Sequence, residues 1–101
     1  MWNIPTNKQL ELIPKLYAQE DVKDKKVYLK FFIGECTWYV TEYDGSDTFF
    51  GLVVSPMCPD GEWGYFSFGE LVSLKRGFVE VDRDLYTLNP RKPKTISEIT
   101  V

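Results

Sequence analysis

The chain is 101 residues long, with 44% hydrophobic, 27% charged and 16% aromatic residues, no histidine and a net charge of −3. This length predicts a single domain over residues 1–101, and the composition excludes an intrinsically disordered chain. The lack of histidine excludes histidine general bases, the usual serine and cysteine triads and most zinc sites. No apolar run approaches the roughly 20 residues that span a bilayer, and no export signal follows Met1. We therefore expect a cytoplasmic protein whose two cysteines, Cys36 and Cys58, are thiols.

The first predicted element is a short amphipathic helix over residues 7–17. Thr6 and Gln9 have the spacing of a capping box, and the apolar residues that follow recur at helical intervals. Pro14 lies inside this helix and should kink or divide it, because proline lacks an amide donor and crowds the preceding turn. A charged segment then connects the helix to the sheet.

Alternating apolar and polar residues predict antiparallel strands over residues 27–33, 36–44 and 48–55. The sequence Asp-Gly-Ser-Asp at 44–47 separates the last two strands, and Asp-Gly between β-rich runs is a strong hairpin signal. Residues 56–61 contain two prolines, an aspartate and a glycine, so they are predicted to form a loop. A short fourth strand is predicted over residues 63–66.

The last third of the chain is predicted to hold a second helix and a final strand. Ser67 and Glu70 have capping-box spacing, and this short helix should end near Gly77. The following pattern predicts one broken strand or two over residues 78–81 and 85–88, then a basic extended tail from about residue 89 and a short element over residues 95–101. The predicted fold class is α+β: a four- to five-stranded antiparallel sheet packed against an N-terminal helix and a short second helix.

Negative charge is concentrated in the middle of the chain, where no lysine or arginine occurs between Lys30 and Lys75. Glu42 and Asp44 are two residues apart on a predicted strand, so they should share a face, and Asp47 follows across the turn. Three converging carboxylates could bind Mg²⁺ or Ca²⁺, or serve a hydrolase. The sequence lacks the ordered ligands of a calcium loop, and hairpin turn chemistry accounts for the aspartates, so neither a metal nor a cofactor is expected.

The same interval is rich in aromatic residues, which could form a stacking platform for single-stranded nucleic acid. Such a platform needs lysine or arginine between the rings to hold the phosphate backbone, and this interval has neither. We therefore expect one set of rings in the core and a second set at a protein interface, with no direct binding of nucleic acid.

Long stretches of the sequence resemble a family of small proteins named domain of unknown function 2958. The resemblance is carried by WYVTEYDGSDTFFGLV (38–53), GYFSFGEL (64–71) and RDLY (83–86), with LIPKLY (12–17) and VYLKFF (27–32) in addition. It covers nearly the whole chain; residues 56–61 and the basic tail depart from the pattern. The resemblance implies carriage on bacterial plasmids, phages and integrative elements, and it extends to small proteins proposed as anti-CRISPR inhibitors of Cas9-type nucleases.

Charge and resemblance together suggest a non-enzymatic protein that inhibits a Cas9-type (type II) defence nuclease through an acidic surface, since such nucleases hold nucleic acid in strongly positive channels. We expect carboxylates to mimic phosphate charge and an aromatic ring to anchor the contact; the expected partner-binding residues are Glu42, Asp44, Asp47, Asp60, Glu62, Tyr43 and Trp63. A monomer without membrane contact is expected. Two alternatives stay open: an accessory adaptor in plasmid or phage maintenance, and a small carboxylate- or metal-dependent hydrolase.

Overall fold

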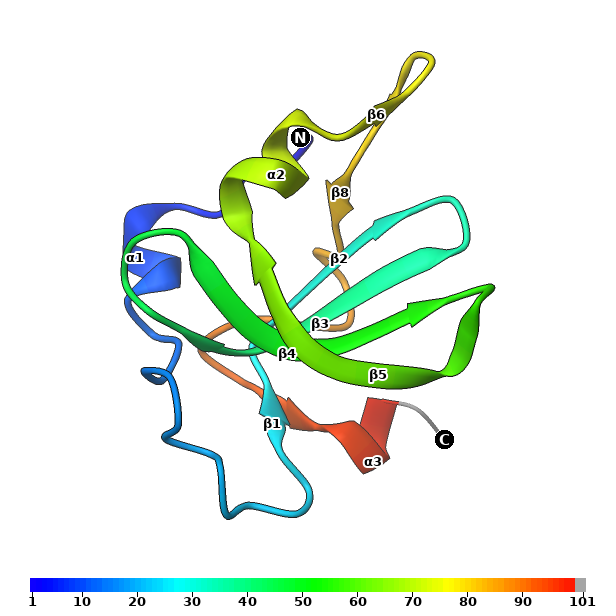
Figure 1. Cartoon of the computed structure of the whole chain (residues 1–101). Helices are drawn as coiled ribbons and strands as arrows, with labels where there is room; N and C mark the ends of the chain where they lie inside the picture. The colour runs from blue at the N-terminus through cyan, green and yellow to red at the C-terminus, as the bar shows by residue number, and fades with distance from the viewer. Residues whose placement is uncertain (100–101) are drawn as a thin grey trace.

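A five-stranded antiparallel sheet forms the centre of the α+β fold (Figure 1). The computed structural model describes residues 1–99. The spatial order of the strands is β5-β4-β3-β2-β8, so consecutive strands are neighbours from β2 to β5. The strands are β2 (Leu29–Ile33), β3 (Cys36–Tyr43), β4 (Thr48–Ser55), β5 (Cys58–Ser67) and β8 (Asp82–Arg83). The predicted fold class is confirmed.

Short helices and two small ladders complete the fold. Strand β1 pairs with β9 next to the last helix, and β6 and β7 form a hairpin that projects from the body of the molecule (Figure 1). These elements are α1 (Asn7–Leu10), β1 (Lys26–Val27), α2 (Phe68–Ser73), β6 (Lys75–Arg76), β7 (Val79–Glu80), β9 (Lys94–Thr95) and α3 (Ile96–Ile99).

The hydrophobic core lies on one face of the sheet. Burial alternates along β2, which places Leu29, Phe31 and Ile33 on the core side, as expected for a strand with one covered face. The ring of Phe31 lies 5.9 Å from that of Phe49 on β4. Leu10 at the end of α1 and Leu71 of α2 belong to the same buried cluster, so both helices cover this face.

The middle of β4 requires glycine. A Cβ atom at Gly51 would lie 1.8 Å from the backbone oxygen of Tyr39 on the adjacent strand. The pairing of β3 with β4 also shifts between Val40 and Glu42, as in a β-bulge. This close approach and bulge set the orientation of the residues that end β3.

The first helix is shorter than predicted, because it ends at Leu10 instead of residue 17. Its Thr6–Gln9 capping box is present. Pro14 has no amide proton to donate to the preceding turn, and its own carbonyl accepts a hydrogen bond from the amide of Tyr43 at 2.9 Å. The proline therefore ends the helical region and attaches it to β3 instead of kinking a longer helix.

The predicted loop over residues 56–61 is wrong. Only Pro56 and Met57 form the turn, and β5 begins at Cys58 and runs for 10 residues. Pro59 fits inside β5 because this strand is at the edge of the sheet, where one side of the backbone has no partner strand.

The predicted final strand is divided between two partners. Val79–Glu80 pairs with β6, whereas Asp82–Arg83 pairs with β2. Residues 85–88 are not a strand: the Asp84 carboxylate accepts hydrogen bonds from the amides at 86 and 87 and closes a bend. The tail from residue 89 is ordered by β9 and α3, and the end of the predicted last element, residues 100–101, lies outside the described residues.

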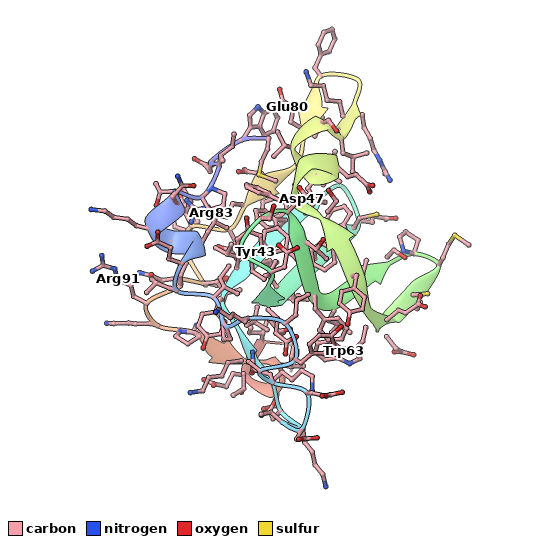
Figure 2. All side chains as sticks on the ribbon, turned by 60° about the vertical axis from the view of Figure 1, so that its left-hand side comes forward. Tyr43, Asp47, Trp63, Glu80, Arg83 and Arg91 are labelled. Carbon is pink, nitrogen blue, oxygen red and sulfur yellow. The ribbon has the colours of Figure 1, made fainter. Side chains whose placement is uncertain are left out.

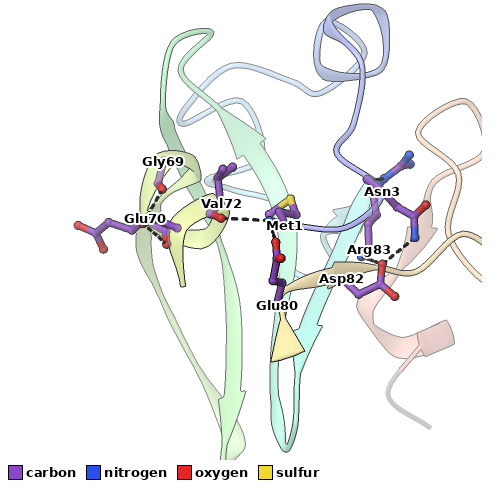
Figure 3. Close-up of polar contacts among 9 residues, drawn as sticks. Met1, Asn3, Gly69, Glu70, Val72, Glu80, Asp82 and Arg83 are labelled. Carbon is purple, nitrogen blue, oxygen red and sulfur yellow. Dashed lines mark hydrogen bonds and ion pairs between the residues drawn. The ribbon is translucent and has the colours of Figure 1, made fainter. Parts of the chain in front are cut away.

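Polar contacts hold the beginning of the chain against α2 and β7 (Figure 3). The ammonium group of Met1 donates to the carbonyl of Val72 at 3.1 Å and lies 2.6 Å from the Glu80 carboxylate. The Asn3 amide donates to Asp82 at 2.8 Å, and Arg83 donates to the Asn3 carbonyl at 2.7 Å. These contacts cover the short strand β8.

Candidate protein-binding surface

The segment over residues 17–25, called the 17–25 loop below, packs on the face of the sheet opposite the core around a buried carboxylate. Glu42 is 3% exposed. Its two oxygens accept hydrogen bonds from the backbone amides of Tyr17 at 2.8 Å and Gln19 at 2.7 Å. Burial of a carboxylate is costly unless hydrogen bonds replace its water, and these two amides do so.

Two further side chains give the loop a fixed shape although it has no helix or strand. The Gln19 amide nitrogen donates to the carbonyls of Lys26 and Thr41, both at 2.9 Å, and its oxygen accepts from the Lys26 amide at 2.7 Å. The Lys25 ammonium group donates to the carbonyls of Gln19 at 2.8 Å and Val22 at 2.6 Å. The 17–25 loop is therefore organised by polar side chains instead of apolar packing.

Four aromatic rings line a groove between this loop and the sheet. Glu42 on β3, Phe50 on β4 and Tyr65 on β5 lie opposite one another in the strand register, so they share a face. Trp63, two residues before Tyr65, is on the same face, and its ring stacks on Phe50 with centroids 5.9 Å apart. The groove has a volume of about 420 Å³. We call it the aromatic groove; it is lined by Tyr17, Phe50, Trp63, Tyr65, Glu20, Asp21, Lys25 and their neighbours.

The aromatic groove already holds one cation. The Lys25 ammonium lies 5.6 Å from the centre of the Trp63 ring, within the range of a cation–π interaction. Glu20 and Asp21 add carboxylates at the rim. Lys23 also lines the groove, so its charges are mixed, and the position of Lys25 shows that its rings accept an ammonium group.

Tyr17 has a strained backbone at the mouth of the groove. Its φ of 72° is in the left-handed region, which non-glycine residues rarely adopt. The Glu42 carboxylate accepts a hydrogen bond from the Tyr17 amide, and the Tyr17 side chain is 64% exposed. A hydrogen bond with the Tyr17 hydroxyl, together with partial desolvation, raises the pKa of Tyr65 above its usual value. Strain held in place by a buried group is typical of functional surfaces.

The residues predicted to form the acidic surface are separated by the structure. Glu42 and Tyr43 are buried, with exposures of 3% and 8%, so the prediction that they form part of an exposed surface is wrong. Figure 2 shows Tyr43 inside the molecule and Trp63 apart from it, beside the chain that precedes β1. The reason is that β3 is central in the sheet, and both of its faces are covered at this end.

Asp44 and Asp47 are exposed but already bonded to nearby backbone. The Asp44 carboxylate accepts from the amides of Ser46, Asp47 and Thr48, which closes the hairpin and lowers the pKa of Asp44. The Asp47 carboxylate accepts from the Ser67 hydroxyl at 2.5 Å and the Gly69 amide at 2.7 Å, so it supports the beginning of α2. The three expected carboxylates thus have three different surroundings, and within residues 1–99 no group of three metal-ligating side chains could hold a metal ion.

Asp60, Glu62 and Trp63 are the expected residues that reach solvent on β5. Trp63 is 40% exposed. Glu62 precedes it directly in the strand and so points to the opposite face. Its carboxylate lies 3.5 Å from the Cys58 sulfur and raises the pKa of that thiol, which keeps Cys58 protonated. The Glu62 carboxylate and the Trp63 ring therefore lie on the two sides of one strand.

Sequence reasoning missed most of the aromatic groove. The sequence pattern places Tyr17 at the end of a helix, and the contact between its amide and Glu42, 25 residues away, has no local signal. Phe50, Trp63 and Tyr65 could have been grouped in advance, because residues of one parity on paired strands share a face. That grouping depends on the register of β5, and the sequence pattern predicts a loop over residues 56–61, where β5 begins.

These features define a small α+β protein with an aromatic, partly acidic surface on an edge strand. The family model described as "Protein of unknown function (DUF2958)" matches residues 4–97, and the chain belongs to this family. No curated protein and no solved structure gives a match. Within residues 1–99, none of the helices has the length and apolar character needed to cross a membrane.

Proposed function

We propose that this protein acts without catalysis, by binding a partner protein through the aromatic groove. The observation that supports this most strongly is the grouping of three exposed rings in one groove: Tyr17 comes from the 17–25 loop, and Trp63 and Tyr65 come from β5. Tryptophan and tyrosine are the residues most enriched among those that carry the energy of protein interfaces. Glu20 and Asp21 at the rim favour a partner surface that carries lysine or arginine.

The partner we propose is a Cas9-type nuclease, and the role is that of an anti-CRISPR inhibitor carried by bacterial mobile elements and acting in the cytoplasm. The resemblance of the sequence to proteins proposed as such inhibitors suggests this partner. The charge of such a nuclease is compatible with the carboxylates at the groove, because these nucleases hold guide and target in positively charged channels. The surface differs from the one expected from the sequence: it is centred on Trp63, with Glu62 on the other side of β5 and Asp60 at the irregular beginning of that strand.

Glu42 keeps a part in this proposal as a positioning residue. It does not reach the partner, because it is buried, but it holds the amides of Tyr17 and Gln19 and so shapes the groove. Asp44 and Asp47 contribute stability of the hairpin and of α2 instead of phosphate mimicry.

The test is a pull-down of purified Cas9-type nuclease, guide-loaded and guide-free, by the wild-type protein and by Trp63→Ala across a salt series. Trp2→Ala is the matched control, because Trp2 is 44% exposed, close to the 40% of Trp63, and does not line the groove. We expect Trp63→Ala to weaken binding at least tenfold, Trp2→Ala to leave it unchanged, and salt to weaken the wild-type complex. Absence of wild-type binding to either nuclease form contradicts the proposed partner.

A further inference from the structure

Strand β5 presents a long backbone edge without a partner strand. Strand order places it at the end of the sheet, and it pairs with β4 alone. Across residues 1–99, no backbone hydrogen bond from outside β4 reaches the stretch between Pro59 and Phe66. The opposite edge, β8, has two residues and lies beside the N-terminal segment, where the Trp2 amide donates to the Val81 carbonyl at 2.8 Å. The two edges of the sheet are therefore very different.

The register identifies which residues of β5 direct their amide and carbonyl outward. The Phe68 amide donates to the Asp47 carbonyl at 2.8 Å, which makes the pair Thr48 and Ser67 a non-hydrogen-bonded pair of the ladder. Hydrogen-bonded and non-hydrogen-bonded pairs alternate along antiparallel strands, so Tyr65 and Trp63 are also in non-hydrogen-bonded pairs. Their backbone N–H and C=O groups therefore point to the open edge.

Only one half of this edge is protected against pairing. Pro59 offers no amide, and Gly61 has a φ of 89°, which interrupts a regular edge. From Glu62 to Phe66 the strand pairs with β4 without a register shift. The half that remains able to pair is the half that carries the rings of the aromatic groove.

The charged residues on and near β5 determine which kind of strand can pair with its open edge. Strand β5 carries Asp60 and Glu62 and no lysine or arginine, so a second copy of the same strand would meet like charges with no cation to neutralise them. On the groove side, Lys25 shows that a lysine ammonium is accepted over the Trp63 ring. Both faces of the edge thus favour an incoming segment that carries cations.

We propose that the partner contributes an extended segment rich in lysine and arginine, which adds to the sheet as a sixth strand along β5. Its backbone pairs with the outward N–H and C=O groups of Trp63 and Tyr65, as in other complexes formed by strand addition. Its side chains alternate between the two faces, so one set meets the aromatic groove with Glu20 and Asp21, and the other meets Glu62. This inference rests on the proposed function and specifies how the partner is bound.

The first test compares Tyr65→Pro with Tyr65→Ala in the nuclease pull-down. Both variants lose the ring, but only proline removes the outward amide, and an amide that faces solvent makes proline tolerable in an edge strand. We expect Tyr65→Pro to bind at least tenfold more weakly than Tyr65→Ala, with far-ultraviolet circular dichroism showing that both are folded. Equal binding by the two folded variants overturns strand addition, and it leaves the proposed function standing if the wild-type protein binds.

The second test uses a probe peptide with the wild-type protein, so it does not depend on a variant that folds. The probe is the acetylated and amidated peptide TVRKVRKVT, whose adjacent arginine and lysine place cations on both faces of a strand. Controls are a twin with its four central amides N-methylated and a twin with glutamate in place of every cation. Amide hydrogen exchange measured by NMR should slow at least tenfold at Trp63 and Tyr65 with the probe and with neither twin. Unchanged exchange at these amides, or equal protection by the methylated twin, overturns the inference.

Discussion

The buried carboxylate of Glu42 gives the most direct test of how the aromatic groove is built. The change is Glu42→Gln, which keeps the size of the side chain but removes the charge and replaces one acceptor oxygen with an NH₂ group. In the wild-type protein, the amides of Tyr17 and Gln19 donate to this carboxylate at 2.8 and 2.7 Å. In the variant, the NH₂ group faces one of these two amides. At least one buried amide loses its acceptor, and the remaining hydrogen bond is no longer to a charged group.

The expected loss follows from these two bonds. A hydrogen bond to a charged group contributes about 1.5–3 kcal/mol, and an amide left unsatisfied costs about 1–3 kcal/mol. We expect the free energy of unfolding to fall by about 2 kcal/mol, since water can reach part of the loop from the groove. In a domain of this size that corresponds to roughly 10 °C in Tm.

Urea unfolding at pH 7, followed by circular dichroism, measures this change. Glu20→Gln is the control, because it makes the same chemical change on an exposed side chain of the same loop, where surface substitutions stay within about 0.5 kcal/mol. The NMR signals of the Tyr17 and Gln19 amides should move in Glu42→Gln and stay in place in Glu20→Gln. Equal unfolding midpoints for the two variants would refute the assignment of Glu42 as the group that holds the loop.

Three further predictions concern the frame around the groove. Gly51→Ala should prevent folding or reduce the unfolding free energy by more than about 3 kcal/mol, because its Cβ would lie 1.8 Å from a backbone oxygen. Gly64→Ala should be tolerated, because there is open space around its Cβ. Thermal melts of the two variants test this difference. Asp47→Ala should cost about 1–2 kcal/mol in urea unfolding by removing the acceptor at the start of α2. Glu80→Gln removes the partner of the Met1 ammonium, whose hydrogen bond lowers the pKa of Glu80 below its usual value. A carboxyl group whose pKa is lower in the folded state stabilises the fold at pH values above its unfolded-state pKa, and this stabilisation is lost as the pH falls through the folded-state pKa. The free energy of unfolding, measured from pH 7 to pH 3, should therefore decline less in Glu80→Gln than in wild type.

The central strands could be predicted from sequence because their signals are local. A side-chain period of two marks Leu29–Ile33, and the Asp-Gly turn marks the hairpin between β3 and β4. Asp44 closes that turn through amides within four residues of it, so its role depends on the same local chemistry. Elements whose hydrogen bonds are formed within a few residues are predictable in this way.

The errors arose where distant contacts decide the outcome. Helical periodicity continued past Leu10, but Pro14 and its contact with Tyr43 ended the helix. Two prolines predicted a loop where β5 begins, since the position of that strand at the edge of the sheet, which tolerates Pro59, is not visible in the sequence. The groove depends on both of these segments, so its assembly could not be derived before the register was known.

The same contacts change the meaning of the acidic interval in the middle of the chain. Counting charges along the sequence gives a continuous negative stretch, but the fold uses Glu42, Asp44 and Asp47 as acceptors for its own amides. These carboxylates already accept hydrogen bonds from the protein's own backbone, and Glu42 is buried, so they offer fewer free acceptor oxygens to a partner than the sequence suggests. Of the carboxylates expected at a partner surface, Asp60 and Glu62 are the two on β5, the strand that carries rings of the aromatic groove and an open backbone edge. A net charge of −3 is small for broad mimicry of nucleic acid, but it fits the proposed surface, in which backbone pairing and ring contacts would provide affinity and a few carboxylates would select the partner.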